Sequence, residues 1–192
     1  MKECDFLNIF VVSLEKDNLR REKLDINPSY IYAINGQYLD IDKLKNDGIV
    51  INNKLTKGEI GCYLSHIHML KKALESNKQV LIIEDDAKIE VDTFQKIKAL
   101  KDIPEDWDIL FIGYNYYEQF SINEFNKIKY LHGAHAYLVN NKNITIEKIN
   151  SLLPIDKPYD IILPIKLKTY IVKPKIIELG DFGHISNTQG IL

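Results

Sequence analysis

Leu81-Ile82-Ile83-Glu84-Asp85-Asp86 is the stretch that decides the fold, because an apolar run stops there at three consecutive acids. Val80 to Ile83 is short and rich in branched residues, which is typical of a strand buried in a sheet. Adjacent carboxylates at the end of such a strand repel one another and lose hydration, so they need a cation or a basic partner. In open α/β sheets, ligands bind beyond the carboxyl ends of strands. The stretch therefore predicts a site for a metal and a phosphate-bearing ligand.

The nature of the expected cation follows from the ligand atoms. Hard carboxylate oxygens favour Mg²⁺ or Mn²⁺ over softer metals. The alternative is that the strand simply ends at Ile83 and that the three acids are solvated turn residues. The position of the acids directly after an apolar strand favours the functional interpretation.

The segments before this strand predict an α/β fold. Ile9 to Leu14 is an apolar run typical of a first strand, and Asp17 is a suitable cap for a helix that follows it. Thr56-Lys57-Gly58-Glu59 matches a capping box, and apolar residues then recur at helical spacing as far as Leu74. A helix that leads into a buried strand, after an earlier strand–helix unit, predicts a mainly parallel sheet flanked by helices.

The remaining segments complete a single expected domain over residues 1–192. We expect helices over Asp92–Leu100 and Ile144–Leu153, and a loop over Tyr114–Phe120. The expected further strands are Tyr30–Ile34 (ended by the turn pair Asn35-Gly36), Trp107–Gly113, Tyr130–Val139 and, at an edge, Thr169–Val172. No internal repeat, low-complexity tract or linker divides the sequence.

Composition narrows the class of protein. The 192 residues are 45% hydrophobic with a formal charge of −2, which predicts a folded core and gives no support for a nucleic-acid binder. The two cysteines, Cys4 and Cys62, predict no disulfide framework, and we find no CxxC or Cys/His metal spacing. No apolar run reaches the roughly 18 residues of a membrane span. We expect a cytoplasmic protein, or a soluble catalytic piece without its own anchor.

Three further groups are candidates for chemistry. Ser13, near the end of the first strand, and the pair Arg20-Arg21 could reach a diphosphate, although arginines on a solvated helix face would look the same. Ser65 and His66 are adjacent on a helix and therefore cannot form a dyad with each other, so a structural histidine is the simpler interpretation. Asp160 could act as a general base or be an ordinary cap or turn residue.

Taken together, these motifs resemble glycosyltransferase family 25, from Phe10 almost to the C-terminus. The strongest match is the run from Leu55 to His66, which is similar to the family signature nearly residue for residue. The other matching pieces, in order, are Phe10–Leu14 with Arg20-Arg21-Glu22, Tyr32–Gly36, Leu81–Asp86, Trp107–Gly113, Ala136–Val139, Pro158-Tyr159-Asp160 and Gly180–Thr188.

The resemblance implies a GT-A-like, Rossmann-related fold and a nucleotide-sugar donor, usually UDP-galactose or UDP-glucose. It implies Mn²⁺ or Mg²⁺ as the cofactor, held by Asp86 with Glu84, and an acceptor that is a glycan or a protein side chain. Asp160 would be the catalytic base of an inverting transfer. His184 stands where the family usually has tyrosine and could supply a further metal ligand. The implied donor-binding residues are Ser13, Arg20, Arg21, Asn35, Glu59, Ser65, His66, Glu84 and Asp85.

Two other functions fit the same residues. The departures at His184 and at Asn187, where aspartate is usual, would suit a catalytically inactive module that binds nucleotide sugars or glycans. A nucleotide-sugar hydrolase, in which water replaces the acceptor, would also suit the acidic cluster.

Overall fold

A six-stranded mixed sheet forms the centre of the computed structural model, which describes residues 5–119 and 128–180. The strand order is β2-β1-β3-β8-β5-β9. The strands span Leu7–Val12 (β1), Tyr30–Ile31 (β2), Gln79–Glu84 (β3), Ile109–Gly113 (β5), Ala136–Val139 (β8) and Thr169–Ile171 (β9). β8 pairs antiparallel with both β3 and β5, and the other five strands share one direction. The predicted α/β fold with a mainly parallel sheet is confirmed.

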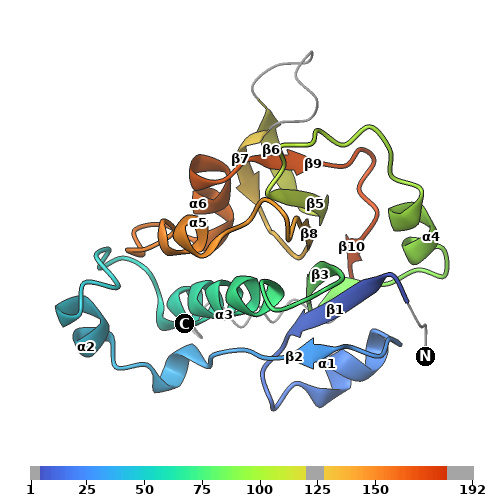
Figure 1. Cartoon of the computed structure of the whole chain (residues 1–192). Helices are drawn as coiled ribbons and strands as arrows, with labels where there is room; N and C mark the ends of the chain where they lie inside the picture. The colour runs from blue at the N-terminus through green and yellow to red at the C-terminus, as the bar shows by residue number, and fades with distance from the viewer. Residues whose placement is uncertain (1–4, 120–127, 181–192) are drawn as a thin grey trace.

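Helices cover both faces of the sheet (Figure 1). α3 (Lys57–Ala73) lies beside α5 (Ile146–Asn150) and α6 (Tyr159–Lys166), whereas α1 (Asn18–Lys23) and α4 (Thr93–Lys98) belong to the other face. Consecutive residues of β3 point to opposite faces of the sheet: Ile82 packs in the cluster under α3 and Ile83 in the cluster near α4. Burial on both faces explains why β3 reads as a continuous apolar run.

Shorter elements lie around this core. α2 covers Ile41–Asn46, and η1 is a 3-10 turn over Gly36–Tyr38. β4 (Ala87–Lys88) pairs with β10 (Glu178–Leu179), and β6 (Tyr116–Gln119) pairs with β7 (Ile128–His132). Within the described ranges, none of the helices is long and apolar enough to cross a bilayer.

The start of α3 forms as the sequence predicts. The Thr56 hydroxyl accepts from the Glu59 N–H at 3.1 Å, and the Glu59 carboxylate accepts from the Thr56 N–H at 2.7 Å. Two glycines then allow the first turn of α3 to touch the Asn35 turn, because a Cβ on Gly61 would lie 2.7 Å from the backbone nitrogen of Gly36. This contact fixes the position of α3 beside the ends of the strands.

Three of the predicted segments are wrong in detail. Tyr116–Gln119 is not a loop but strand β6, paired with β7, while Phe120 lies outside the described residues. The single strand predicted over Tyr130–Val139 is two strands, because the chain turns at Gly133 with φ near +71°. The second predicted strand extends only over Tyr30–Ile31, since the chain then leaves the sheet edge toward α3.

Candidate functional site

The candidate site lies where β1 and β3 end at the same edge of the sheet. Val12 and Glu84 are register partners, and the Asp85 N–H donates to the Val12 carbonyl at 3.2 Å. Ser13 follows directly after β1 and is buried. Two neighbouring parallel strands therefore deliver Ser13 and the three acids to one place, as the switch-point rule predicts.

Arg20 of α1 is the basic partner of the acids. One of its terminal nitrogens lies 3.0 Å from Asp85 Oδ1 and 3.1 Å from Asp86 Oδ2. Arg21 has a different task, since it donates to the Ser13 hydroxyl at 2.8 Å, to the Leu14 carbonyl and to the Asn18 side chain. Neither arginine is merely a solvated charge: Arg20 neutralises part of the cluster, and Arg21 holds the turn between β1 and α1.

Arg20 does not fully neutralise the negative charge of Asp86. Its Oδ1 is buried and has no hydrogen-bond partner among the residues that the structure describes. Burial first, and then the negative charges of Glu84 and Asp85, raise the pKa of Asp86 to about 7 against the opposing effect of Arg20. The pKa of Asp85 is also raised, chiefly by burial, although the Ser13 hydroxyl and Arg20 counteract this. A buried carboxylate oxygen without a donor, among other carboxylates, fits a hard divalent cation.

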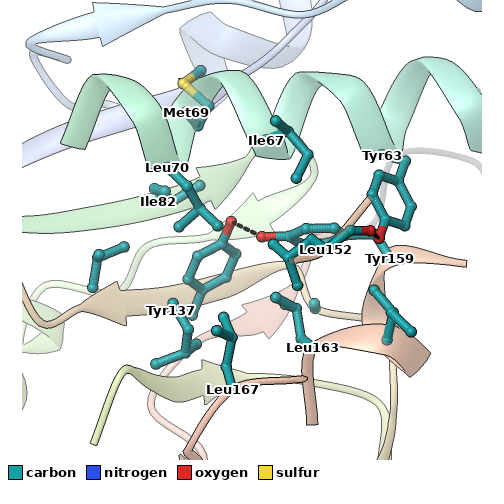
Figure 2. Packing of buried hydrophobic residues seen from close by; sticks show 14 of the residues in the cluster. Tyr63, Ile67, Met69, Leu70, Ile82, Tyr137, Leu152, Tyr159, Leu163 and Leu167 are labelled. Atoms are coloured by element: carbon teal, nitrogen blue, oxygen red, sulfur yellow. Dashed lines mark hydrogen bonds between the residues drawn. The ribbon is translucent and has the colours of Figure 1, made fainter. Parts of the chain in front are cut away.

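Glu84 points toward a buried ring system under α3. Its Oε1 lies 3.3 Å from His66 Nε2, and His66 Nδ1 lies 2.8 Å from the Tyr137 hydroxyl. The Tyr137 and Tyr159 hydroxyls meet at 3.1 Å and point toward each other (Figure 2). The His66 ring also stacks on that of Tyr159, with centroids 4.4 Å apart. His66 is therefore a buried, packed histidine that also contacts the first acid of the cluster.

Three predicted donor-binding residues have local structural partners. The Ser65 hydroxyl accepts from the Ile34 N–H at 2.8 Å and donates to the Gly61 carbonyl at 2.6 Å, which ties the chain after β2 to α3. Asn35 accepts from the Gln37 N–H at 3.0 Å and so caps η1. Glu59 caps α3. Contact of these residues with a donor stays a prediction.

Asp160 lies in the first turn of α6 and is held by the chain between β7 and β8. Its Oδ2 accepts from the Gly133 N–H at 2.8 Å and lies 3.6 Å from His132 Nδ1. The same segment reaches the acidic cluster, because the His135 carbonyl accepts from the Glu84 N–H at 2.9 Å. The segment therefore connects Asp160 with the end of β3.

Cys62 is a site residue that the sequence reasoning missed. It lies one helical turn before His66, and its sulfur, a His66 nitrogen and a Glu84 oxygen lie within 4.8 Å of one another. Burial raises the pKa of the Cys62 thiol, and the charges of Glu84, Asp160, Asp86 and Glu59, in that order, raise it further. Our expectation of no Cys/His metal spacing was wrong, because positions i and i+4 on one helix face suit two ligands.

The predicted ligand His184 lies outside the described residues. The structure does show where the chain leads toward it. Gly180, the last described residue, donates its N–H to the Asp86 carbonyl at 2.7 Å. A role for His184 at the metal stays a prediction.

The fold and the site define an α/β protein that gathers carboxylates and an arginine at the ends of parallel strands, as proteins that bind phosphate-bearing ligands do. Residues 6–154 match the sequence profile of glycosyltransferase family 25 (LPS biosynthesis protein). The chain therefore belongs to glycosyltransferase family 25. Asp160 lies beyond the matched residues.

Individual relatives agree with this assignment. The chain is 26% identical to procollagen galactosyltransferase 2 of Mus musculus, over 96% of this chain and 37% of that protein. It is 27% identical to inactive glycosyltransferase 25 family member 3 of Homo sapiens, over 56% of this chain and 22% of that protein. The chain thus spans well under half the length of the curated relatives it matches.

A solved structure supports the fold. It is a glycosyltransferase involved in the glycosylation of the major capsid of PBCV-1, with a TM-score of 0.51 and 10% identity. The match covers 94% of each chain. Because the identity is so low, this likeness concerns the arrangement of helices and strands and not the substrates.

Proposed function

We propose that this chain is a metal-dependent glycosyltransferase that moves galactose or glucose from a UDP-sugar to a hydroxyl of a glycan or of a protein side chain, with inversion. The observation that carries the proposal is the Arg20–Asp85–Asp86 arrangement at the ends of β1 and β3. It combines a cation-binding carboxylate with a guanidinium that suits a diphosphate, in a chain of this family.

Asp86 is the proposed principal ligand of Mn²⁺ or Mg²⁺, assisted by Glu84 and by His184. When bound, the cation supplies positive charge that stabilises the departing diphosphate. Arg20 adds charge-assisted hydrogen bonds to the same group, and Asp85 is proposed to bind the ribose. The residues proposed to shape the donor pocket around them are Ser13, Arg21, Asn35, Glu59, Ser65 and His66.

Asp160 is the proposed general base. In an inverting transfer the acceptor oxygen forms a bond to the anomeric carbon while the bond from that carbon to the UDP oxygen breaks. The proton of the acceptor hydroxyl then goes to Asp160. The Gly133 N–H, from which Asp160 already accepts a hydrogen bond, orients the carboxylate for this task.

The relatives suggest two acceptor classes to test. The Mus musculus relative is named for procollagen and the family for LPS biosynthesis. A collagen-type peptide with hydroxylated side chains and a lipopolysaccharide-type oligosaccharide are therefore the first acceptors to offer.

The test measures UDP release with UDP-galactose, UDP-glucose and UDP-N-acetylglucosamine, with Mn²⁺ and with a chelator. We expect Mn²⁺-dependent release that at least one acceptor accelerates. Asp86→Asn should abolish it, whereas Asp92→Asn, which removes an exposed acid of an i,i+4 ion pair, should leave it unchanged. The proposal fails if no donor releases UDP and calorimetry detects no UDP binding.

A binding module without transferase activity is the second candidate. The observation that favours it is the likeness to a human relative whose name describes it as inactive. This function would be supported if the parent protein binds UDP, if Asp86→Asn loses that binding, and if no sugar is transferred to either acceptor class.

A further inference from the structure

A cluster of three side chains, Cys62, His66 and Glu84, lies beside the acidic site. The proposed sugar transfer does not need these three residues to act together. Cys62 and His66 lie on one face of α3, and Glu84 ends the neighbouring strand β3. One ligand atom from each lies within 4.8 Å of the other two. The three side chains therefore converge on a common point between α3 and the sheet.

The spacing of these atoms is close to that of a tetrahedral metal site. A Zn²⁺ ion binds histidine nitrogen and carboxylate oxygen at about 2.0 to 2.2 Å, so two such ligands lie about 3.3 to 3.5 Å apart. His66 Nε2 and Glu84 Oε1 are 3.3 Å apart. Little movement of these two groups is needed to accept a metal.

The histidine is also oriented as a metal ligand should be. Metal-binding histidines usually have their second ring nitrogen fixed by a hydrogen bond, which sets the ring orientation. His66 Nδ1 lies 2.8 Å from the Tyr137 hydroxyl, which itself bonds to that of Tyr159. Stacking on Tyr159 holds the ring plane, and Nε2 faces Glu84.

The charge around Cys62 favours a cation. Four carboxylates, those of Glu59, Glu84, Asp86 and Asp160, act on its sulfur electrostatically. A bound cation would be attracted by these negative charges. Thiolate and imidazole ligands select borderline-soft metals such as Zn²⁺ rather than Mg²⁺ or Mn²⁺.

We propose that Cys62, His66 and Glu84 bind a Zn²⁺-class metal ion at a site distinct from the hard-cation site at Asp86. The fourth position of the metal would be open to water, as in zinc sites with three protein ligands. Glu84 is a proposed ligand at both sites, with Asp86 at one and with Cys62 and His66 at the other, so occupation of one should weaken the other. The inference does not rest on the proposed transferase function.

Cobalt(II) is the direct probe, because a cobalt–thiolate bond gives a charge-transfer band in the near ultraviolet. We expect metal-stripped protein to develop this band at one equivalent of Co²⁺ and to lose it when Zn²⁺ is added. Cys62→Ser should not develop it, whereas Cys4→Ser, the matched control at the other cysteine, should. No thiolate band in the parent protein, or a band retained in Cys62→Ser, overturns the proposal.

Two further variants separate this site from that of Asp86. Asp86→Asn should keep the cobalt–thiolate band, and Glu84→Gln should reduce the affinity for Co²⁺ at least tenfold. Thermal melting of each variant shows whether it remains folded, and Cys62→Ala provides a second thiol-free protein if Cys62→Ser is unstable. Loss of the band in Asp86→Asn with the fold intact would show a single shared site and refute two distinct ones.

Discussion

Replacing Asp86 by asparagine should stabilise the metal-free chain while it removes the binding of Mn²⁺ at the proposed hard-cation site. The carboxylate is partly buried, one of its oxygens lacks a donor within the described part of the chain, and two other acids adjoin it. The asparagine amide would keep nearly the same shape without the charge. The proposed metal ligand should therefore destabilise the fold when no cation is bound.

The magnitude follows from the raised pKa. The change from 3.8 to about 7 corresponds to roughly 4 kcal/mol against the ionised form, at 1.36 kcal/mol per pH unit. The Asp86 side chain is 29% exposed, so solvent screening reduces this to about 2 kcal/mol. The folded-state pKa of Asp86 lies above the unfolded one. The parent protein therefore has its full free energy of unfolding below about pH 4, where Asp86 is protonated, and loses this contribution as the pH rises through about 7.

Urea unfolding in the presence of a chelator measures this effect. Asp86→Asn should be about 2 kcal/mol more stable than the parent at pH 8, less so at pH 5, and nearly equal to it at pH 4. Adding Mn²⁺ at a hundred times its dissociation constant should then stabilise only the parent, by about 2.7 kcal/mol.

The control is Asp92→Asn, whose exposed carboxylate pairs with Lys96 and should show neither effect. The reasoning is refuted if Asp86→Asn is as stable as the parent, or less stable, at pH 8. A difference that does not change between pH 4 and pH 8 would refute the electrostatic explanation as well.

Two other substitutions test the surroundings of the site. Arg20→Ala should weaken UDP binding by about 10- to 100-fold, the range expected for lost charge-assisted hydrogen bonds, whereas Lys23→Ala on the same helix should leave calorimetric affinity unchanged. Tyr137→Phe should lower the free energy of unfolding by about 1 to 3 kcal/mol, because it removes a buried hydroxyl that bonds to His66 and Tyr159; urea unfolding equal to that of the parent would contradict the role of this network.

The sequence predicted the parts of the fold that depend on local pattern. The apolar run before Glu84 predicted β3, and the Thr56 capping box predicted the start of α3 to the residue. Both signals are contained in a few consecutive residues. The gathering of Ser13 and the acids follows instead from the pairing of β1 with β3, because neighbouring parallel strands end at a common edge of the sheet.

The parts that failed depend on pairing between distant segments. β6 reads as an aromatic and polar loop, and it is a strand only because β7 supplies its hydrogen bonds. The break at Gly133 likewise follows from the hairpin and from the contact between its N–H and Asp160. A single glycine inside a predicted strand does not reveal either partner.

Residue roles were harder to predict than residue positions. Arg20 and Arg21 are neighbours in the sequence, yet one binds the acids and the other holds a turn. Adjacent residues on a helix point about 100° apart, so only the docking of α1 decides which of them reaches Asp85. Cys62 escaped notice because its partner Glu84 is contributed by another element.

The acidic cluster shows why the site is built around an imperfectly neutralised charge. Arg20 pairs with Asp85 and with one oxygen of Asp86, whereas Glu84 lies against His66. A second arginine at Asp86 Oδ1 would neutralise more of this charge, but it would also occupy the position of the proposed cation. In the proposed metal site, the residual negative charge would be a cost in stability that leaves room for a divalent ion, and the stability of Asp86→Asn measures that cost.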